Sequence, residues 1–252
     1  GATDRRFGLE EEGAATVEFL IPLAVTAGAL AAALAHQRHV AGVWRRAAAD
    51  AGLTDVREVG SLAGIKILEG KAGPFGVRIE RIRSRSKRGT RLIGDGQSAL
   101  SPSLAFRAEG LATTVDRLMG GRELEIGDPA FDDGVYARGA EEQLLALLDA
   151  PTRTAVRALT DLSGRVSDGL VSIEVTEVFP DAAGLAALLR TAIGMAERLK
   201  RPDDLVARLA ANVRNDPVPA VRRKNLALLA ERYASDPTAR ETLHAVLAAD
   251  DR

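Results

Sequence analysis

The sequence contains no cysteine among its 252 residues, only three histidines and 4% aromatic side chains. The absence of cysteine excludes a disulfide framework, a thiolate metal site and a thiol nucleophile, but leaves the cellular compartment open. The histidines, His36, His39 and His244, do not form a metal-ligand set, and none lies in the middle of the chain to act as a catalytic base. We therefore expect a protein that is not an enzyme and holds no cofactor or metal.

The sequence also lacks an excess of either charge, because 34 basic residues balance 35 acidic ones and leave a net charge of -1. This balance excludes a chain that is basic throughout, so contact with nucleic acid or anionic lipid would need a local patch. A hydrophobic content of 46% indicates a folded protein with a real core, in one sizeable domain or two small ones.

One apolar run stands out near the N-terminus, where residues 19–35 are uncharged and mostly hydrophobic. At 1.5 Å per residue this run barely reaches across a hydrocarbon core about 30 Å thick. We interpret residues 14–37 as a transmembrane helix that follows an acidic tail, residues 1–13. A buried helix, packed on the body of the protein or in a partner subunit, is the alternative. The anchoring side chains would be Phe19, Leu20, Ile21, Leu23 and Val25.

The flanking charges give an orientation to such a helix. Arg38, Arg45 and Arg46 follow the run, whereas only Arg5 and Arg6 precede it. Since positive residues favour the cytoplasmic side, we expect a bacterial inner-membrane protein with most of its chain in the cytoplasm.

A short juxtamembrane helix is expected next, over residues 38–52. Trp44 would then lie at the level of the lipid headgroups, and His36 and His39 would be interfacial. The segment AGLTD, which begins at Ala51, supplies a glycine stop for this helix.

The rest of the chain predicts an α+β fold that ends in helices. Between residues 62 and 108, alternation of apolar and polar residues predicts a meander of about four antiparallel strands. Two more short strands are expected around an acidic turn in residues 121–139, then two helices broken at Pro151 and a strand in LVSIEVTEVF. Everything after Pro180 has helical spacing, so we predict an α+β domain, residues 53–198, with packed helices, and an all-α segment of helical hairpins, residues 199–252.

Several of these segments together resemble a known family. The order of an apolar helix, VWRRAAADAGL, a strand meander, ELEIGDPAFDDGVYARG and LVSIEV resembles the N-terminal module of uncharacterised, membrane-anchored HEAT-repeat proteins of myxobacterial type. The final stretch, NDPVPAVRRKNLALLAERYASDPTARETLHAVLAADDR, is similar to a HEAT unit, with Asp216, Pro217, Val221 and Arg222 at the positions that turn between and cap the helices.

This resemblance implies a function in protein binding. HEAT arrays are stacks of helix pairs that bind other proteins, and a single unit cannot bury its apolar face alone. The last unit therefore packs on the α+β domain, or the sequence is a piece of a longer array. The function implied is a non-catalytic, single-pass membrane-anchored scaffold for other proteins, or an accessory subunit of a larger membrane complex.

A second resemblance concerns the segment GAATVEF. Gly13, Glu18 and Phe19 have the spacing of the processing site of type IV prepilins and Tad-type pseudopilins. It implies a filament or secretion-system subunit whose N-terminal helix packs into a helical core.

Basic residues are concentrated in one stretch of the predicted meander. In a strand, side chains 81, 83 and 85 would point the same way, with positions 87 and 88 at a hairpin tip. Anionic lipid or a partner protein is the candidate ligand, whereas nucleic acid is not expected because no aromatic residues interleave the run. A solvated hairpin face that prevents wrong strand pairing is the alternative. The candidate contact residues are Arg81, Arg83, Arg85, Lys87, Arg88 and Arg91, with Arg78 in the same run.

Acidic residues gather in GDPAFDDG. Asp128, Asp132 and Asp133 could supply oxygen ligands for a hard cation, but their spacing matches no EF-hand loop. Asp-Pro and Asp-Asp-Gly are turn formers, so we expect a structural turn.

Overall fold

The computed structural model describes residues 11–61, 64–83, 88–95, 100–110, 123–175 and 181–250. Within these ranges it gives the backbone alone for 11–27, 61, 64–66, 83, 88–89, 95 and 249–250. The elements are α1 Glu11–Asp50, β1 Thr54–Ser61, β2 Gly64–Ala72, β3 Phe75–Arg83, β4 Arg88–Asp95, β5 Ala105–Ala108, α3 Pro129–Asp132, β6 Val135–Arg138, α4 Glu141–Leu147, α5 Ala150–Asp161, β7 Gly164–Ser167, β8 Leu170–Val175, α6 Ala182–Arg198, α7 Leu205–Asn215, α8 Pro219–Arg232 and α9 Pro237–Asp250.

Eight strands form one antiparallel sheet in the order β1-β2-β3-β4-β8-β7-β5-β6. Strands β1 to β4 follow one another as a meander, and β8 then returns beside β4, although it comes last in the chain. The predicted α+β class, with an N-terminal helix, an antiparallel sheet and helices at the C-terminal end, is confirmed.

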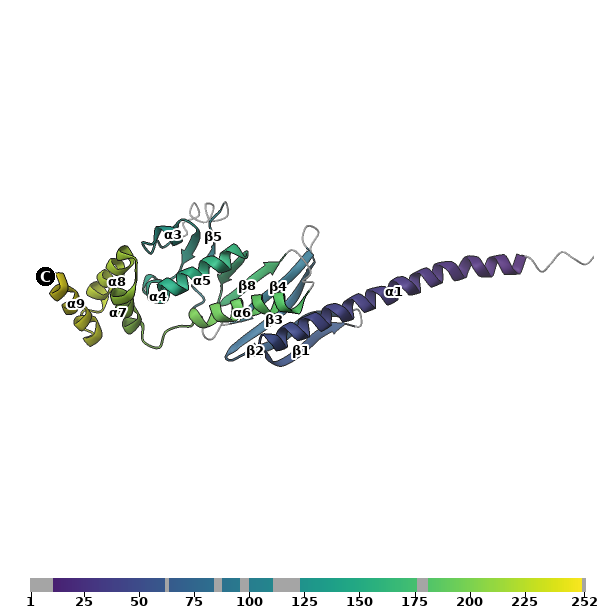
Figure 1. The fold of residues 1–252 in the computed structure, drawn as a ribbon, viewed down its shortest axis with the longest axis horizontal. Coiled ribbons are helices and arrows are strands. Elements are labelled where there is room, and N and C mark those ends of the chain that lie inside the picture. Colours follow the sequence, from purple (N-terminus) through teal and green to yellow (C-terminus); the bar gives the residue numbers. More distant parts are fainter. Residues whose placement is uncertain are drawn as a thin grey trace, which may run out of the picture.

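The two faces of the sheet differ because side chains alternate along each strand. One face carries the buried apolar residues, such as Leu68, Ile79, Leu92 and Ile173. Helices α1 and α6 lie side by side over β2, β4 and β8 on this face, and α5 covers β5, β6 and β7 (Figure 1). The opposite face bears charged side chains, which are described below.

Helix α1 runs without interruption from Glu11 to Asp50, so the helix expected over residues 38–52 is present as the last part of α1 and not as a short element of its own. Alanine, the best helix former, dominates this region and gives no reason for a break. The helix ends as predicted at Gly52, whose φ of +75° suits glycine, and the Leu53 N–H donates to the Ala48 carbonyl at 2.9 Å.

Trp44 does not lie at a lipid surface, because its side chain is 1% exposed and belongs to the protein core. Its neighbours on the same side of α1, Val40, Ala47 and Ala48, are buried as well. The small alanines allow α1 to approach α6 closely, and Arg190 of α6 donates to the Asp50 carbonyl at 3.0 Å. The second half of α1 is therefore a core helix.

Most of the expected strands are present. The predicted meander corresponds to β2, β3, β4 and β5, and the strand in LVSIEVTEVF corresponds to β8. Strands β1 and β7 were not predicted. Of the two strands expected around the acidic turn only β6 forms, since residues 123–126 make one backbone bond to it, from Leu124 N–H to the Ala137 carbonyl at 3.0 Å.

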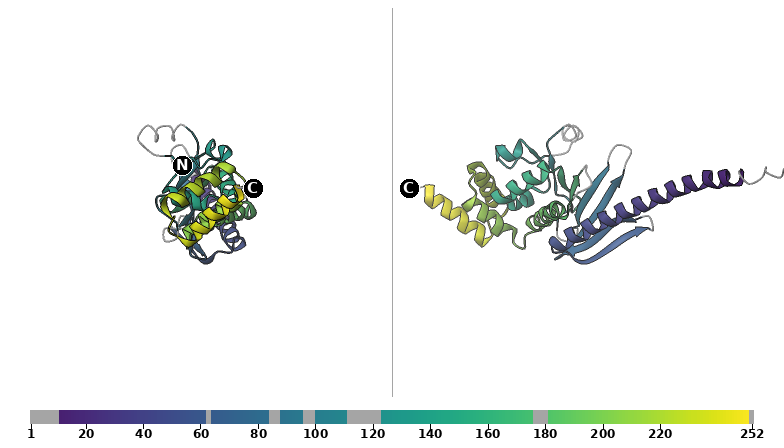
Figure 2. Two further views of the ribbon diagram at one scale, coloured as in Figure 1. Left: turned by 90° about the vertical axis from the view of Figure 1, so that its left-hand side faces the viewer. Right: turned by 45° about the vertical axis from the view of Figure 1, so that its right-hand side comes forward.

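The helices follow the sequence closely. The break between two helices that was expected at Pro151 falls just before this residue, because Pro151 stands in the first turn of α5. Asp149 caps α5 by accepting from the Thr152 N–H at 2.9 Å. The predicted helical end is confirmed by α6, α7, α8 and α9. The right-hand view of Figure 2 shows an elongated molecule, with the start of α1 at one end and α9 at the other, and the left-hand view looks along its length.

The packing of α1 predicts unequal effects for two substitutions in the same helix. Trp44→Ala should lower the free energy of unfolding by about 3–5 kcal/mol, because it opens a cavity in the core. Leu30→Ala is the control, since Leu30 is 63% exposed and its loss should change the same quantity by less than about 0.5 kcal/mol. Urea denaturation of both variants in mild detergent measures the difference, and equal effects would contradict this placement of α1.

Candidate functional site

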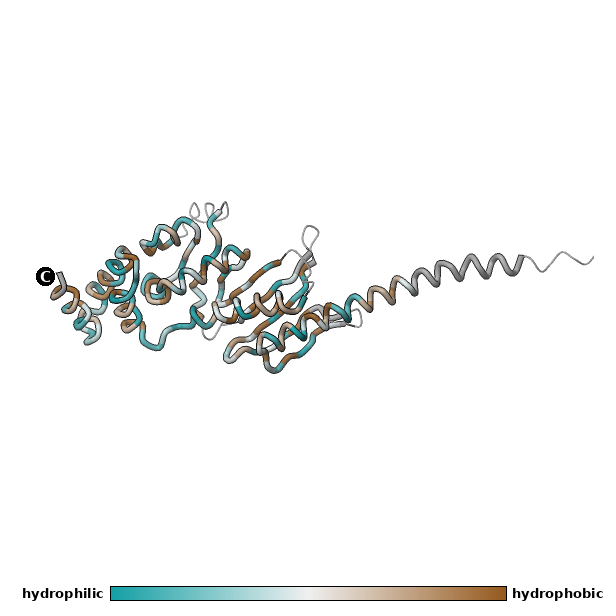
Figure 3. The backbone as a smooth tube through the Cα atoms, in the orientation of Figure 1, coloured by the Kyte–Doolittle hydropathy of each residue, from teal (hydrophilic) through white to brown (hydrophobic). Residues whose placement is uncertain are grey.

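The N-terminal half of α1 extends beyond the sheet and is the most distinctive surface of the molecule (Figure 1). From position 28 to 36 every side chain is exposed, and burial begins at Val40. Leu30 and Leu34 are 63% and 38% exposed, and these turns are coloured hydrophobic in Figure 3. Nothing else in the described part of the chain covers them. The anchoring side chains predicted before them, Phe19, Leu20, Ile21, Leu23 and Val25, lie outside the residues whose side chains are described.

Arg81 lies where α1 leaves the sheet. It follows Val77 and Ile79 on the face of β3 that the helices cover, and its Nη2 atom is 3.4 Å from Nε2 of the exposed His36. The chain of β3 then continues in the direction in which α1 extends. The end of β3 at Arg83 is therefore at the same end of the molecule as the exposed half of α1.

The predicted basic residues do not all gather on one face. Arg91 lies on the opposite face from Arg81, where it bonds Glu80 at 2.9 Å and Glu174 at 2.8 Å. Arg83 and Arg88 are paired in the backbone of β3 and β4, and their side chains are not described. Arg85 and Lys87 lie outside the described residues.

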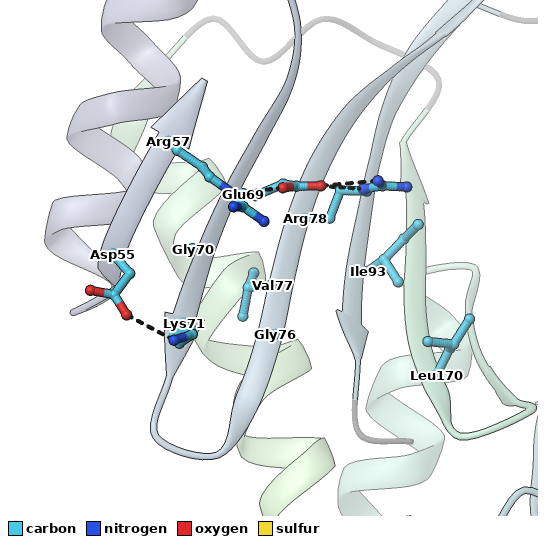
Figure 4. Close-up of a pocket in the computed structure, with 10 residues that line it drawn as sticks. All are labelled: Asp55, Arg57, Glu69, Gly70, Lys71, Gly76, Val77, Arg78, Ile93 and Leu170. Atoms are coloured by element: carbon cyan, nitrogen blue, oxygen red, sulfur yellow. Dashed lines mark hydrogen bonds and ion pairs between the residues drawn. The ribbon is translucent and has the colours of Figure 1, made fainter. Parts of the chain in front are cut away.

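The open face of the sheet carries rows of alternating charge. Glu69 of β2 lies between Arg57 of β1, at 2.9 Å, and Arg78 of β3, at 3.0 Å (Figure 4). The hydrogen bond from Arg78 lowers the pKa of Glu69, and the bond from Arg57 acts in the same direction. A cavity of about 790 Å³ lies over these strands, and an ion pair of Lys71 with Asp55 at 3.0 Å lies on its wall (Figure 4). The charges here are satisfied by one another, which favours a solvated face over a catalytic cleft.

The acidic turn has a structural role. The two carboxylate oxygens of Asp132 accept from the N–H groups of Ile126 and Gly127, at 3.0 and 2.9 Å. Asp128 accepts from Arg153 at 2.7 Å. These bonds hold the loop before α3 in place, which agrees with the interpretation of GDPAFDDG as a turn. The described residues contain no cluster of three or more histidine, aspartate or glutamate side chains suited to a metal ion.

Arg153 forms a buried ionic joint with Asp128 and Asp216, which the sequence did not reveal. Its Nη1 and Nη2 atoms bond the two oxygens of Asp216 at 2.7 and 3.0 Å, and Nη1 also bonds the Leu148 carbonyl at 2.8 Å. Burial alone would lower the pKa of Arg153, but its hydrogen bonds to Asp216 and then to Asp128 outweigh burial and raise that pKa. The joint ties α5 to the loop before α3 and to the turn between α7 and α8.

Sequence reasoning identified Asp128 and Asp216 as turn residues but gave no signal for Arg153, which stands in an ordinary amphipathic helix. Asn212 is a further residue of this kind. It is 6% exposed, and its side-chain amide donates to the Leu145 carbonyl at 2.7 Å, which joins α7 to α4. Arg153 and Asn212 both act through contacts with residues that are distant in the sequence.

The helices that the structure describes include none with both the length and the apolar character needed to cross a membrane. The expected span, residues 14–37, begins with fourteen residues whose side chains lie outside this description. Comparison of the chain with protein-family models, with curated proteins and with solved structures finds no match in any of the three.

The ionic joint predicts a large loss of stability when one partner is removed. Asp216→Ala should lower the free energy of unfolding by about 3–5 kcal/mol, because it leaves the buried Arg153 charge without its main partner. The matched control is Arg157→Ala, which removes an exposed arginine one turn further along α5 and should cost less than about 0.5 kcal/mol. Chemical denaturation measures both, and a loss below about 1 kcal/mol for Asp216→Ala would show that the joint is not needed.

Proposed function

We propose that this chain is a non-catalytic interaction protein that is attached to the bacterial inner membrane through α1 and presents its folded body to other proteins. The observation that carries the proposal is the exposed apolar part of α1. Leu30 and Leu34 extend past the sheet with the alanines around them, and an exposed apolar surface of this kind marks a site of contact with lipid or another protein.

The position of the basic residues supports the proposal that a membrane covers the exposed half of α1. Arg81, with the paired backbone of Arg83 and Arg88 next to it, lies at the end of the sheet from which α1 extends. Arginines close to an anionic surface each contribute about 1 kcal/mol of attraction. With the remainder of the proposed span supplied by residues 14–27, the chain would cross the membrane once, with its body in the cytoplasm.

The C-terminal helices are proposed as the surface for protein partners, in the manner of a HEAT unit. Their connection has the features that the sequence resemblance implies. Asp216 accepts from the Val218 N–H at 2.9 Å, Arg222 donates to the Asp216 carbonyl at 2.7 Å, and Val221 is 1% exposed. On α9, Leu247 is 65% exposed, so an apolar side chain is available at the far end of the molecule.

A filament or secretion-system subunit is the second candidate, and the division of α1 favours it. Such a subunit needs one half of its N-terminal helix free to pack with other helices and the other half joined to a folded head. Helix α1 is divided in this way near Val40, where burial begins. An accessory subunit of a larger membrane complex would use the same surface.

Cell fractionation tests the attachment directly. The full chain should sediment with membranes and be released by detergent but not by high salt, because burial of apolar surface does not weaken with ionic strength. A variant lacking residues 1–37 keeps the buried residues from Val40 onward and should be soluble. A full chain found in the soluble fraction without a partner would contradict the proposal. A mature chain that begins at Ala14, shown by mass spectrometry, would favour the filament subunit.

The basic residues make a second prediction. In the variant lacking residues 1–37, reversal of Arg81, Arg83 and Arg85 to glutamate should abolish binding to vesicles that contain phosphatidylserine. Binding of the unreversed variant should weaken steeply with salt, since the screening length is about 10 Å at 0.1 M.

The control for this experiment reverses three exposed arginines near the other end of the molecule, Arg198, Arg201 and Arg240. This variant should bind vesicles as the unreversed one does. If the truncated protein fails to bind anionic vesicles even at low salt, the β3–β4 region is a solvated edge and has no role at the membrane.

A further inference from the structure

A small cavity of about 220 Å³ lies on the open face of the sheet, at the end formed by β5, β6 and β7. Three arginines from three neighbouring strands line it: Arg107 of β5, Arg138 of β6 and Arg165 of β7. Tyr136 and Ser167 complete its polar lining. This cavity is separate from α1, from the β3–β4 connection and from the C-terminal helices.

The strand register explains why the cavity forms. Ala105 pairs with Arg138, and Arg107 pairs with Tyr136, so these four residues share the open face of β5 and β6. Alanine at position 105 leaves space where a longer side chain would fill the gap between its neighbours. The arginines therefore surround a hollow formed by a small residue.

The electrostatics of this hollow favour an anion. Among the residues that the structure describes, none of the side chains that line it is a carboxylate. Arg107 is held over the Tyr136 ring, with Cζ 4.6 Å from the ring centroid. Arg165 gives one bond to Glu174 at 3.2 Å and has further N–H donors, and Arg138 is exposed.

Tyr136 supplies an independent indication of a ligand. Its side chain is 1% exposed, although it stands on the face of the sheet that the helices leave open, and its hydroxyl is buried without a hydrogen-bond partner. Buried hydroxyl groups in proteins are nearly always bonded, because an unmade bond costs free energy. A hydroxyl in this position is suited to donate to an anion held by the arginines.

We propose that this cavity binds a phosphate group, either as inorganic phosphate or as a phosphate monoester. Guanidinium groups bind phosphate oxygens through paired N–H donors, and a doubly charged anion gains most from several arginines. The volume admits one phosphoryl group and no large organic ligand. The ligand can come from a soluble phosphate or from the headgroup of a lipid such as phosphatidic acid.

Titration calorimetry of the full chain in mild detergent with orthophosphate, at constant ionic strength set by chloride, tests the proposal. Phosphate should bind, and Arg138→Gln should weaken binding by about tenfold or more, because it removes one charged donor from an exposed position. Arg157→Gln, which removes an exposed arginine from α5, should leave the affinity unchanged. Absence of phosphate binding, or equal losses in the two variants, would overturn the proposal.

Tyr136→Phe separates a binding role from a packing role. If the hydroxyl donates to phosphate, this variant should bind orthophosphate about threefold to tenfold more weakly, while its melting temperature without phosphate stays equal or rises. If Tyr136 serves only in packing, the variant should show the same melting temperature and an unchanged affinity for orthophosphate. That result would contradict a role of the hydroxyl in the site.

Vesicles distinguish the two sources of phosphate. Binding to phosphatidylcholine vesicles that depends on added phosphatidic acid and on Arg138 would identify a lipid headgroup as a ligand. Dependence on Arg138 for orthophosphate alone would identify a soluble phosphate. In either case the result is independent of whether α1 anchors the protein, because Arg138→Gln leaves α1 unchanged.

Discussion

One face of the sheet carries the apolar side chains of β2, β3, β4 and β8, and helices must cover it to keep it from water. The second half of α1 and the whole of α6 provide this cover, and Trp44 is among the side chains that they bury. An α-helix is a stiff element whose axis continues in one direction. Because α1 begins at Glu11 and the sheet uses it only from Val40, the first half has to extend away from the body. The exposed apolar surface is thus a direct consequence of how the core is built.

The C-terminal helices share the same hydrophobic core, through residues such as Leu209 and Leu229, and a polar joint adds to this packing. Arg153 is 3% exposed and Asp216 is 5% exposed, so the desolvation of both charges opposes their attraction. Such a joint adds less net stability than its short distances suggest, but it admits one arrangement only, because three bonds to fixed acceptors must be made together. Arg232, which bonds Glu142 at 2.8 Å, adds an exposed contact between α8 and α4. These polar contacts add to the apolar packing that holds α7 and α8.

The sequence predicted the elements whose pattern is set by their own burial. Residues 64–95 alternate because one side of each strand meets the helices, and the helices after Pro180 have apolar residues at helical spacing. Strand β1 escaped prediction because it lies at the edge, where Val56 and Val59 are exposed and the register shifts twice. Strand β7 is four residues long, too short to show a period.

The residues of the candidate sites were predicted less well, because their roles depend on distant partners. The sequence analysis treated the basic residues as one group on one face. Arg81 and Arg91 stand on two different strands of a hairpin, and the register of that hairpin places them on opposite faces of the sheet. Arg81 pairs in the backbone with Thr90, which is buried on the helix side, so Arg91 must point the other way. The turn residues were recognised from their local chemistry. The roles of Arg153 and Tyr136 could not be recognised, because the sequences of α5 and β6 do not indicate which distant residues contact them.

The two structural constraints together define how the molecule can act. Helix α1 is continuous through its exposed and buried halves, so the surface that covers its N-terminal half fixes the direction of the sheet as well. The joint at Arg153 fixes the turn between α7 and α8 relative to α5 and hence to the sheet. Helices α7, α8 and α9 lie at the end of the molecule opposite the free half of α1 (Figure 1), so the proposed partner surface is opposite the proposed attachment. The described apolar exposure is therefore unequal at the two ends, with Leu30 and Leu34 on α1 and Leu247 alone on α9.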